Sequence, residues 1–354
     1  MANAKEIQNR IKSIKDTMKI TKAMYLMSSM KLRKAKEKLA DTEPYFFALE
    51  DEITDILLHF PNIEDIFFDN RSEDRRETYK RRAYIIMTGD KGMAGAYNHN
   101  VLKEAQDLIG PPPSPDSTDA EQPDGAQKAN KAADPASAGS DPAEKDAGQI
   151  PAKLYELYVV GELGRAYFRG QKYPMADDFY FSANNPTMHR ARLITGRVVT
   201  KYQNEEFDEL YLVYTRMVNS MKEEVQVQRL LPLKTQEFVV AEVQEKIANG
   251  TLKQEVFDEK DEWYLFYPTP RAILEKLVYN YLTGFIYGAM VEAFASEENA
   301  RMMAMQSATD NANAMLSELS IEYNRVRQAA ITQEITEVIS GAKALKKKKA
   351  TQGK

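Results

Sequence analysis

The chain of 354 residues contains no cysteine, only three histidines and a single tryptophan. The lack of cysteine excludes disulfides, zinc–thiolate sites and catalysis by a thiol of this chain. The histidines, His59, His99 and His189, are scattered and do not have the spacing of metal ligands, so a histidine metal site is not expected. The net charge of −5 argues against a general nucleic-acid binder.

The sequence also has no clear targeting or membrane-spanning segment. Its first residues mix acids with bases and have no apolar core, unlike a signal or transit peptide. The most apolar stretch, residues 277–295, contains one charge, Glu292, together with Asn280, three tyrosines and two glycines. This composition favours a helix that protein covers on several faces over a transmembrane helix. We therefore expect no transmembrane segment and a bacterial cytoplasmic setting.

Heptad patterns are present at both ends of the chain. Steps of four and three residues connect Ile7, Ile11, Ile14, Met18, Thr21, Tyr25, Ser28, Leu32, Ala35 and Leu39. Nearly the same spacing connects Met305, Ala308, Ala312, Met315, Leu319, Tyr323, Val326 and Ala330. Two such seams predict a long antiparallel coiled coil of the N- and C-terminal helices. Residues 1–40 carry eleven basic and three acidic side chains and residues 271–344 carry six and nine, which favours this pairing.

The terminal helices are expected to be long. The first is predicted over residues 3–58, where Pro44 permits a bend, and belongs to an N-terminal helical domain of residues 1–60. The second begins at Pro270, where the first turn of a helix tolerates proline, and continues to about residue 345. At ~1.5 Å per residue this second helix would be ~110 Å long, so most of it must project from a domain of this size.

Residues 82–267 predict a central Rossmann-like α/β domain with a mixed sheet. Strands are expected at 83–87, 153–160, 209–216, 224–231 and 263–267, and helices at 98–108, 162–169 and 188–202. Between these elements, residues 111–148 are rich in Pro, Ala, Asp, Ser and Gly. Such a composition predicts a disordered insertion, for which an inert solvated loop is favoured over a regulatory segment.

Few residues suggest chemistry. The turn Gly89–Gly95 follows a strand, but its lysine precedes the second glycine and no hydroxyl follows, unlike a phosphate-binding loop. A tight turn between strand and helix is favoured, and a nucleotide site stays the alternative. The basic run Lys31–Lys38 indicates a solvated face or a docking face for acidic loops. The methionines at 24, 27, 30, 302, 303 and 305 either fill the coiled-coil core or form an adaptable contact surface.

Four segments resemble one family, the gamma subunit of the rotary F-type ATP synthase. Lys19–Met24, with Lys31–Ala35 after it, is similar to the family's first helix, and Thr88–Asn98 is similar to its glycine-containing turn. Ser296–Met305 resembles a third block, and Ile331–Ala342 fits the C-terminal signature at every fixed position. The resemblance covers nearly the whole chain except residues 111–148. The cysteine pair of the chloroplast relatives is absent, so their redox control is not expected.

The resemblance implies a central rotor shaft that is not catalytic and needs no cofactor or metal of its own. Its expected partners are three alpha and three beta subunits, the epsilon subunit and the membrane c-ring. The chain would couple rotation of a proton-driven c-ring to ATP synthesis or hydrolysis at the beta subunits, and would contribute to regulation of ATPase activity and proton flow. It would lie peripherally on the cytoplasmic side of the bacterial inner membrane.

The resemblance also implies positions of contact between rotor and stator. Lys22 and Met24 correspond to shaft positions near a moving lever of a beta subunit, and Arg301, Gln328 and Thr332 correspond to positions that contact beta-subunit loops. A guanidinium such as that of Arg301 can form and release charge-assisted bonds to a carboxylate loop. The other hypotheses are an enzyme with a nucleotide site at Gly89–Gly95 and a coiled-coil scaffold unrelated to ATP synthesis.

Overall fold

The computed structural model describes residues 4–60, 63, 65–68, 80–112, 155–219, 222–234, 238, 267 and 269–351. The chain forms two compact units, one of Met1–Lys31 with Asn299–Lys354 and one of Leu32–Glu298. This grouping follows contacts rather than continuous segments, so the domain ranges 1–60, 82–267 and 270–345 stay a prediction. Most of the predicted insertion, from residue 113 on, and the predicted strand residues 263–266 lie outside the described residues; Tyr267 is a bend rather than strand.

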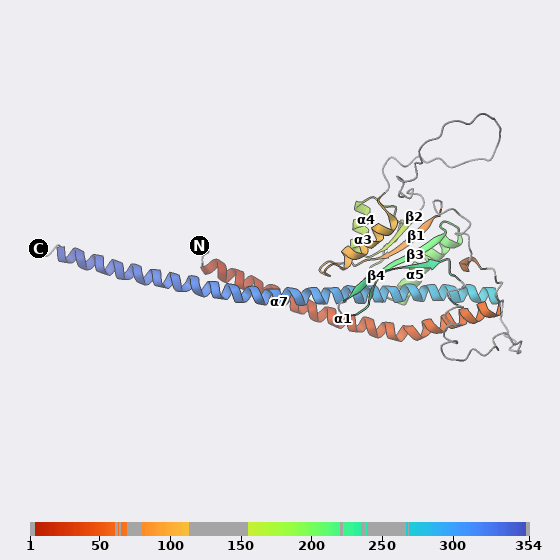
Figure 1. Ribbon diagram of the computed structural model, residues 1–354, viewed down its shortest axis with the longest axis horizontal. Helices are drawn as coiled ribbons and strands as arrows, with labels where there is room; N and C mark the ends of the chain where they lie inside the picture. The colour runs from red at the N-terminus through yellow and green to blue at the C-terminus, as the bar shows by residue number, and fades with distance from the viewer. Residues whose placement is uncertain are drawn as a thin grey trace, which may run out of the picture. The chain divides into compact units, whose positions relative to one another are not determined.

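Two long helices contribute to both units. Helix α1 spans Ala4–His59 and contains Pro44 without ending there, and helix α7 spans Pro270–Thr351 (Figure 1). Pro270 occupies the first turn of α7, and the Thr269 hydroxyl accepts a hydrogen bond from the amide of Ala272 at 3.3 Å. Both features are typical of a helix start. The two predicted terminal helices are confirmed.

In the unit of residues 1–31 and 299–354, the helices pair along the predicted seam. Every predicted α1 position in this unit is buried or partly buried. The hydroxyls of Thr21 and Thr309 lie 2.8 Å apart across the pair. On α7 the prediction is wrong at Met315 and Ala330, which are exposed, and Leu316 is partly buried in place of Met315. A straight helix has 3.6 residues per turn, so its buried side drifts away from a strict seven-residue repeat.

In the unit of residues 32–298, a close contact joins the other halves of the two helices. A β-carbon at Gly284 of α7 would lie 2.4 Å from the Phe46 ring of α1. That ring also makes an edge contact with Tyr281, at 6.3 Å between centroids. Glycine at position 284 therefore gives the Phe46 ring the space that it occupies against α7.

The same unit contains a four-stranded mixed sheet in the order β2-β1-β3-β4. Its strands are β1 Arg82–Met87, β2 Tyr155–Val160, β3 Glu209–Met217 and β4 Glu223–Leu231, and the shorter helices are α3 Tyr97–Ile109, α4 Glu162–Gly170, α5 Met188–Gln203 and the 3-10 turn Ile66–Phe68. Strand β1 is parallel to β2 and β3, and β4 is antiparallel to β3. The predicted α/β fold with a mixed sheet is confirmed.

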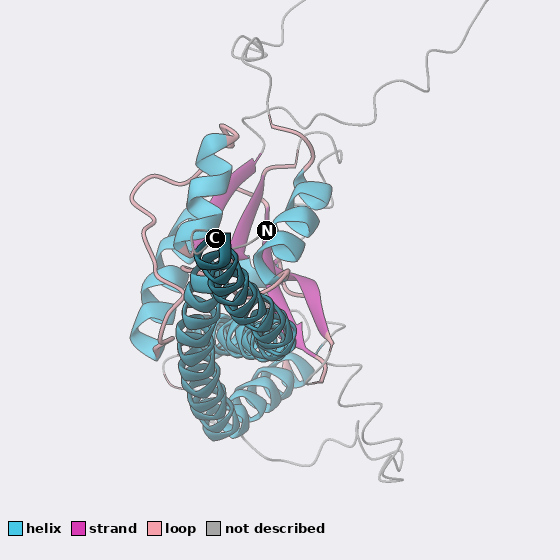
Figure 2. Ribbon diagram, turned by 90° about the vertical axis from the view of Figure 1, so that its left-hand side faces the viewer, coloured by secondary structure: helices cyan, strands magenta, loops and turns pink. Residues whose placement is uncertain are grey.

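The sheet carries helices on both of its faces (Figure 2). On one face Tyr84, Ile86, Leu157 and Val159 form a buried core with residues of α3 and α4, among them Val101 and Phe168. Alternate strand residues point to the other face, because side chains alternate along a strand. There α7 reaches the sheet: the Ser296 hydroxyl donates to the carbonyl of Thr215 at 3.2 Å.

The apolar stretch 277–295 is part of α7 in this unit. All of its residues except Asn280 are buried or partly buried. This agrees with the prediction that protein covers the stretch on several faces. None of the described helices combines the length and the apolar character that crossing a membrane requires.

Asp90 organises the turn that follows β1. Its carboxylate accepts hydrogen bonds from the amides of Glu162 and Asn184, each at 3.1 Å, and from the side chains of Ser182 and Asn184. Burial acts to raise the pKa of Asp90, but the hydrogen bonds, that from Ser182 foremost, outweigh it and hold the pKa below its ordinary value. One carboxylate thus joins the end of β1 to the start of α4 and to the segment 182–184.

We expect Gly284→Ala to destabilise the full chain by about 1–3 kcal/mol, because the new methyl group overlaps the Phe46 ring. Gly288→Ala is the matched control on the same helix, since a β-carbon there meets no atom within 4 Å. It should be neutral or stabilise by up to about 1 kcal/mol through helix propensity. Urea denaturation measures both. Equal effects of the two changes would contradict the contact, and Phe46→Leu should restore much of the loss in Gly284→Ala.

We expect Asp90→Asn to lower the free energy of unfolding by about 1–2 kcal/mol at neutral pH, because charge-assisted hydrogen bonds are lost. The folded pKa is depressed, so this stabilisation is present above the ordinary carboxyl pKa and disappears as pH falls through the folded value. Denaturation at several pH values should therefore show the difference from the unmodified chain shrinking in acid. Asp107→Asn, at an exposed position on α3, is the control and should change little; a loss of similar size there would refute the assignment.

Candidate functional site

The turn at Gly89–Gly95 lies at the carboxyl end of β1, the place where open α/β sheets commonly bind ligands. Here a carboxylate of the chain itself is next to the turn. A β-carbon at Gly89 would lie 2.8 Å from Oε1 of the buried Glu297 of α7. The amide of Gly89 donates to Oδ1 of Asn98 at 2.8 Å, so it is not directed at a ligand. Two carboxylates, Asp90 and Glu297, would repel a phosphate, and the turn serves to join strand and helix.

The described residues offer no other recognisable chemistry. Within the ranges that the structure describes, no group of three or more His, Cys, Asp or Glu side chains could hold a metal ion. His99 on α3 and His189 on α5 are both exposed. The remaining candidate residues lie on the long helices α1 and α7.

The five residues predicted to contact a stator lie in the unit of residues 1–31 and 299–354. Lys22 is exposed and Met24 is partly buried on α1, while Gln328 and Thr332 are exposed on α7. The Thr332 hydroxyl donates to the carbonyl of Gln328 at 2.9 Å, one turn earlier. Arg301 differs from the others because only 7% of it is exposed, so the chain itself covers most of the guanidinium.

An apolar stripe near the C-terminal end of α7 was not among the predicted residues. Ile331, Ile335, Val338 and Ile339 are 47%, 54%, 71% and 50% exposed. Their spacing of four, three and one places them on one side of the helix. From residue 327 to residue 343 every side chain is exposed. Hydrophobic periodicity in the C-terminal signature could have identified this stripe.

At the 100° of rotation per residue of an α-helix, Gln328 and Thr332 lie on the same side of α7 as the apolar stripe. The helix therefore presents two predicted contact residues and four large apolar side chains together. We name this set, Gln328, Ile331, Thr332, Ile335, Val338 and Ile339, the α7 surface. A large exposed apolar surface on one side of a helix is typical of a protein interaction site.

The methionines divide between the two alternatives left open by the sequence. Met305 is buried at 7% exposed and fills the coiled-coil core. Met27, Met30 and Met303 are 50%, 66% and 43% exposed. Core filling is therefore confirmed for Met305, whereas an adaptable contact surface of the exposed methionines stays a prediction.

The basic run on α1 is mostly solvated. Leu32 and Ala35 are buried, whereas Arg33 is exposed and pairs with Glu37 at 3.0 Å one turn away. Lys38 is partly buried and donates to Oδ1 of Asn185 and to the carbonyl of Pro186, both at 3.3 Å. The other cations of this run, at positions 31, 33, 34 and 36, are exposed, whereas Lys38 is engaged within the chain.

Comparison with known proteins identifies one family. The family model described as ATP synthase matches residues 3–123 and 132–345. The ATP synthase gamma chain of Acetivibrio thermocellus is 37% identical over 350 residues, with 98% of this chain and 100% of the relative covered. The sodium-ion-specific ATP synthase gamma chain of Acetobacterium woodii is 36% identical over 344 residues, covering 97% and 99%. The central stalk and c-ring structure of the Tetrahymena thermophila mitochondrial ATP synthase contains a chain that is 18% identical, with a TM-score of 0.48 and coverage of 82% and 99%.

The family match leaves only residues 124–131 of the central region unmatched. The expectation that all of 111–148 falls outside the family resemblance is therefore wrong. At 37% identity over nearly the full length of both proteins, the relationship is established by sequence. The chain belongs to the ATP synthase gamma chain family, whose members are subunits of the synthase rather than catalytic enzymes by themselves.

Proposed function

We propose that this chain is the central rotor shaft of a bacterial ATP synthase. Part of α1 and α7 would turn inside a ring of three alpha and three beta subunits, and the α/β unit would contact the epsilon subunit and the membrane c-ring. Rotation of the c-ring would be transmitted to the catalytic beta subunits, or driven by them during hydrolysis. The chain would lie peripherally on the cytoplasmic side of the inner membrane and would contribute to regulation of ATPase activity.

The observation that carries this proposal is the α7 surface. Its four large apolar side chains are about half exposed or more, although apolar side chains gain roughly 1.5–3 kcal/mol each when fully buried. Within the described part of the chain no α1 residue covers them, since every α7 residue from 327 to 343 is exposed. A sleeve of other subunits around this end of the helix would bury the stripe and still leave the helix able to turn.

The five predicted contact residues belong to the same proposal. Lys22, Met24, Gln328 and Thr332 have side chains that a surrounding subunit could reach without rearrangement of the chain. A direct contact by Arg301 would require its side chain to leave a nearly buried position. Contacts that differ between rotational positions would shift the affinities of the beta subunits, whereas contacts that are equal in all positions would not.

The coupled ion is proposed to be the proton. A sodium-specific relative of 36% identity shows that similarity to a gamma chain does not by itself select the ion. Ion choice depends on the c-ring, whose side chains bind the ion. The shaft role proposed here is the same for either ion.

We expect alpha and beta subunits reconstituted with this chain to hydrolyse ATP rapidly, and the same subunits without it to show little activity. The physical reason is that an asymmetric shaft makes the three beta subunits differ in nucleotide affinity. A coupled assay of ADP release measures this. The chain alone should be inactive, and ATPase activity that never depends on the chain would refute the shaft proposal.

We expect the double change Ile335→Asn and Val338→Asn to weaken the hold of the ring on the shaft by about 2 kcal/mol or more, because buried apolar area is lost. ATP hydrolysis and co-purification of the reconstituted complex should both decrease. The matched control is Gln333→Asn with Ser340→Asn, which changes exposed residues on the opposite side of α7. Circular dichroism should show that both variants keep their helix content. Equal losses in the two variants would count against the α7 surface.

A further inference from the structure

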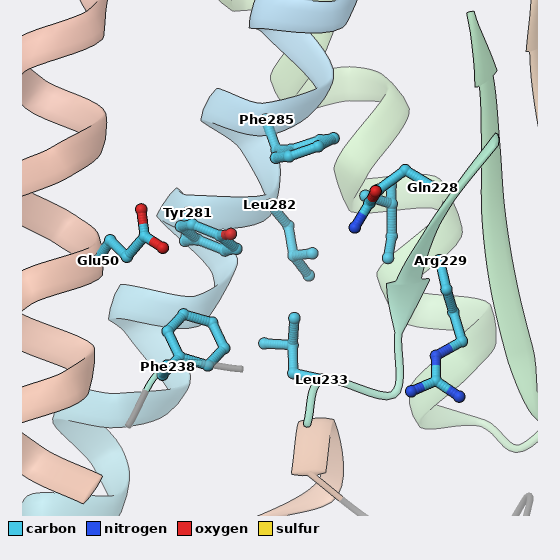
Figure 3. Close-up of a pocket in the computed structure, with 9 residues that line it drawn as sticks. Glu50, Gln228, Arg229, Leu233, Phe238, Tyr281, Leu282 and Phe285 are labelled. Carbon is cyan, nitrogen blue, oxygen red and sulfur yellow. The ribbon is translucent and has the colours of Figure 1, made fainter. Parts of the chain in front are cut away.

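A cavity of about 190 Å³ lies between α1, β4 and α7, in the unit of residues 32–298 (Figure 3). The residues that line it are distant in sequence from those of the α7 surface, and the proposed shaft role does not involve this cavity. Polar and apolar atoms contribute about equally to its surface, and Leu230, Leu233 and Leu282 contribute aliphatic side chains. A dry cavity of ~150 Å³ is large enough to bind benzene, so this one could hold a ring with a short substituent.

Three aromatic rings line the same cavity. The Phe238 and Tyr281 rings meet edge to face with centroids 5.6 Å apart, and the centroids of the Tyr281 and Phe285 rings are 6.3 Å apart. Figure 3 shows Tyr281 and Phe285 on α7, with the Phe238 ring beside that of Tyr281. Aromatic faces carry negative partial charge and attract cations placed over them. The rings therefore favour a ligand with a cationic group rather than a neutral or anionic one.

Among the described residues that line the cavity, Glu50 of α1 is the only acidic one. Its side chain extends from α1 toward Tyr281 (Figure 3). Among the described residues its carboxylate has neither an ion pair nor a hydrogen bond. Burial, with a further contribution from Asp51, raises the pKa of Glu50, as expected for a carboxylate that lacks a nearby cation.

Arg229, the one basic residue among the described residues that line the cavity, does not supply that cation. Arg229 follows Gln228 on β4, and successive strand residues point to opposite faces of the sheet. In Figure 3 the guanidinium of Arg229 points away from Glu50. Arg229 pairs in register with Tyr211, whose side chain packs against the core on the α3 side. Among the described residues that line the cavity, none therefore places a positive charge next to the carboxylate and the three rings.

A second cavity nearby serves as a comparison. It has a volume of about 270 Å³ and is lined by Glu43, Arg216 and Glu292, among others. There Arg216 lies 3.5 Å from Glu292, so the cavity already contains a cation from the chain itself. In the first cavity the guanidinium of Arg229 points away from Glu50, so no pair of this kind forms among its described lining residues.

We propose that the cavity between α1, β4 and α7 binds a small organic cation, an ammonium group carried on an aromatic or compact apolar body. Glu50 neutralises the ammonium group, and the rings of Phe238, Tyr281 and Phe285 pack against the cation and its apolar body. Such a ligand contacts both α1 and α7 and stabilises the folded chain, since it binds the folded form only. This inference does not depend on the proposed shaft role.

Two probes of nearly equal shape test the charge requirement: benzylammonium and benzyl alcohol. Their affinities for the full chain at neutral pH are measured by ligand-observed NMR titration. Benzylammonium should bind about tenfold more tightly than benzyl alcohol, an advantage of ~1.4 kcal/mol. In Glu50→Gln, which keeps the shape of the side chain, this preference should disappear while benzyl alcohol binds as before.

Glu52→Gln is the matched control, because Glu52 is an exposed acid on the same helix, two residues away. It should retain the full preference for benzylammonium. Leu233→Phe, which places a ring in the cavity, should lose both probes. Three results would each overturn the proposal: no saturable binding of benzylammonium, equal affinities in the unmodified chain, or a preference that persists in Glu50→Gln. A loss of preference in Glu52→Gln would also overturn it, by showing a general charge effect.

Discussion

The mutual burial of α1 and α7 is the interaction on which the rest of the structure depends. Neither helix is stable as a long isolated helix in water, because most helical stability in proteins comes from packing of an apolar side. In one unit the predicted seam of α1 is covered by α7, with Thr21 and Thr309 in contact across it. Polar residues in a seam cost stability and specify register, so this hydroxyl pair helps to define how the helices align.

The α/β unit uses the same helices as part of its own core. Glu297 and Ser296 of α7 lie against the turn and the strands, and Asp90 joins that turn to neighbouring segments. In a Rossmann-like fold the crevice at the carboxyl ends of the strands is open to a ligand. Here the carboxylates of Asp90 and Glu297 lie beside the turn at that place. The fold is retained and the ligand site is not, which illustrates that function is determined by the site rather than by the fold.

Periodicity predicted the helices and the four described strands to within a few residues, because long periodic segments are encoded locally. The features that could not be predicted from the sequence depend on contacts between segments that are far apart in the chain. Leu316 is partly buried where Met315 was predicted to be, because the buried side of a straight helix drifts relative to a seven-residue repeat. Arg301 is buried because of how the residues around it pack. The exposure of the stripe from Ile331 to Ile339 depends on how far α1 extends alongside α7. Local sequence patterns do not predict this extent.

The uncovered end of α7 has a consequence for the life of the chain in the cell. Arg325, Arg327 and Lys343 are exposed, and every α7 side chain from residue 327 to residue 343 is exposed, which makes this part of the helix accessible to proteases that cleave after basic residues. Enclosure by partner subunits would remove that access. Unassembled copies would then be degraded faster than assembled ones, and the supply of partners, rather than synthesis of this chain, would determine its steady-state abundance.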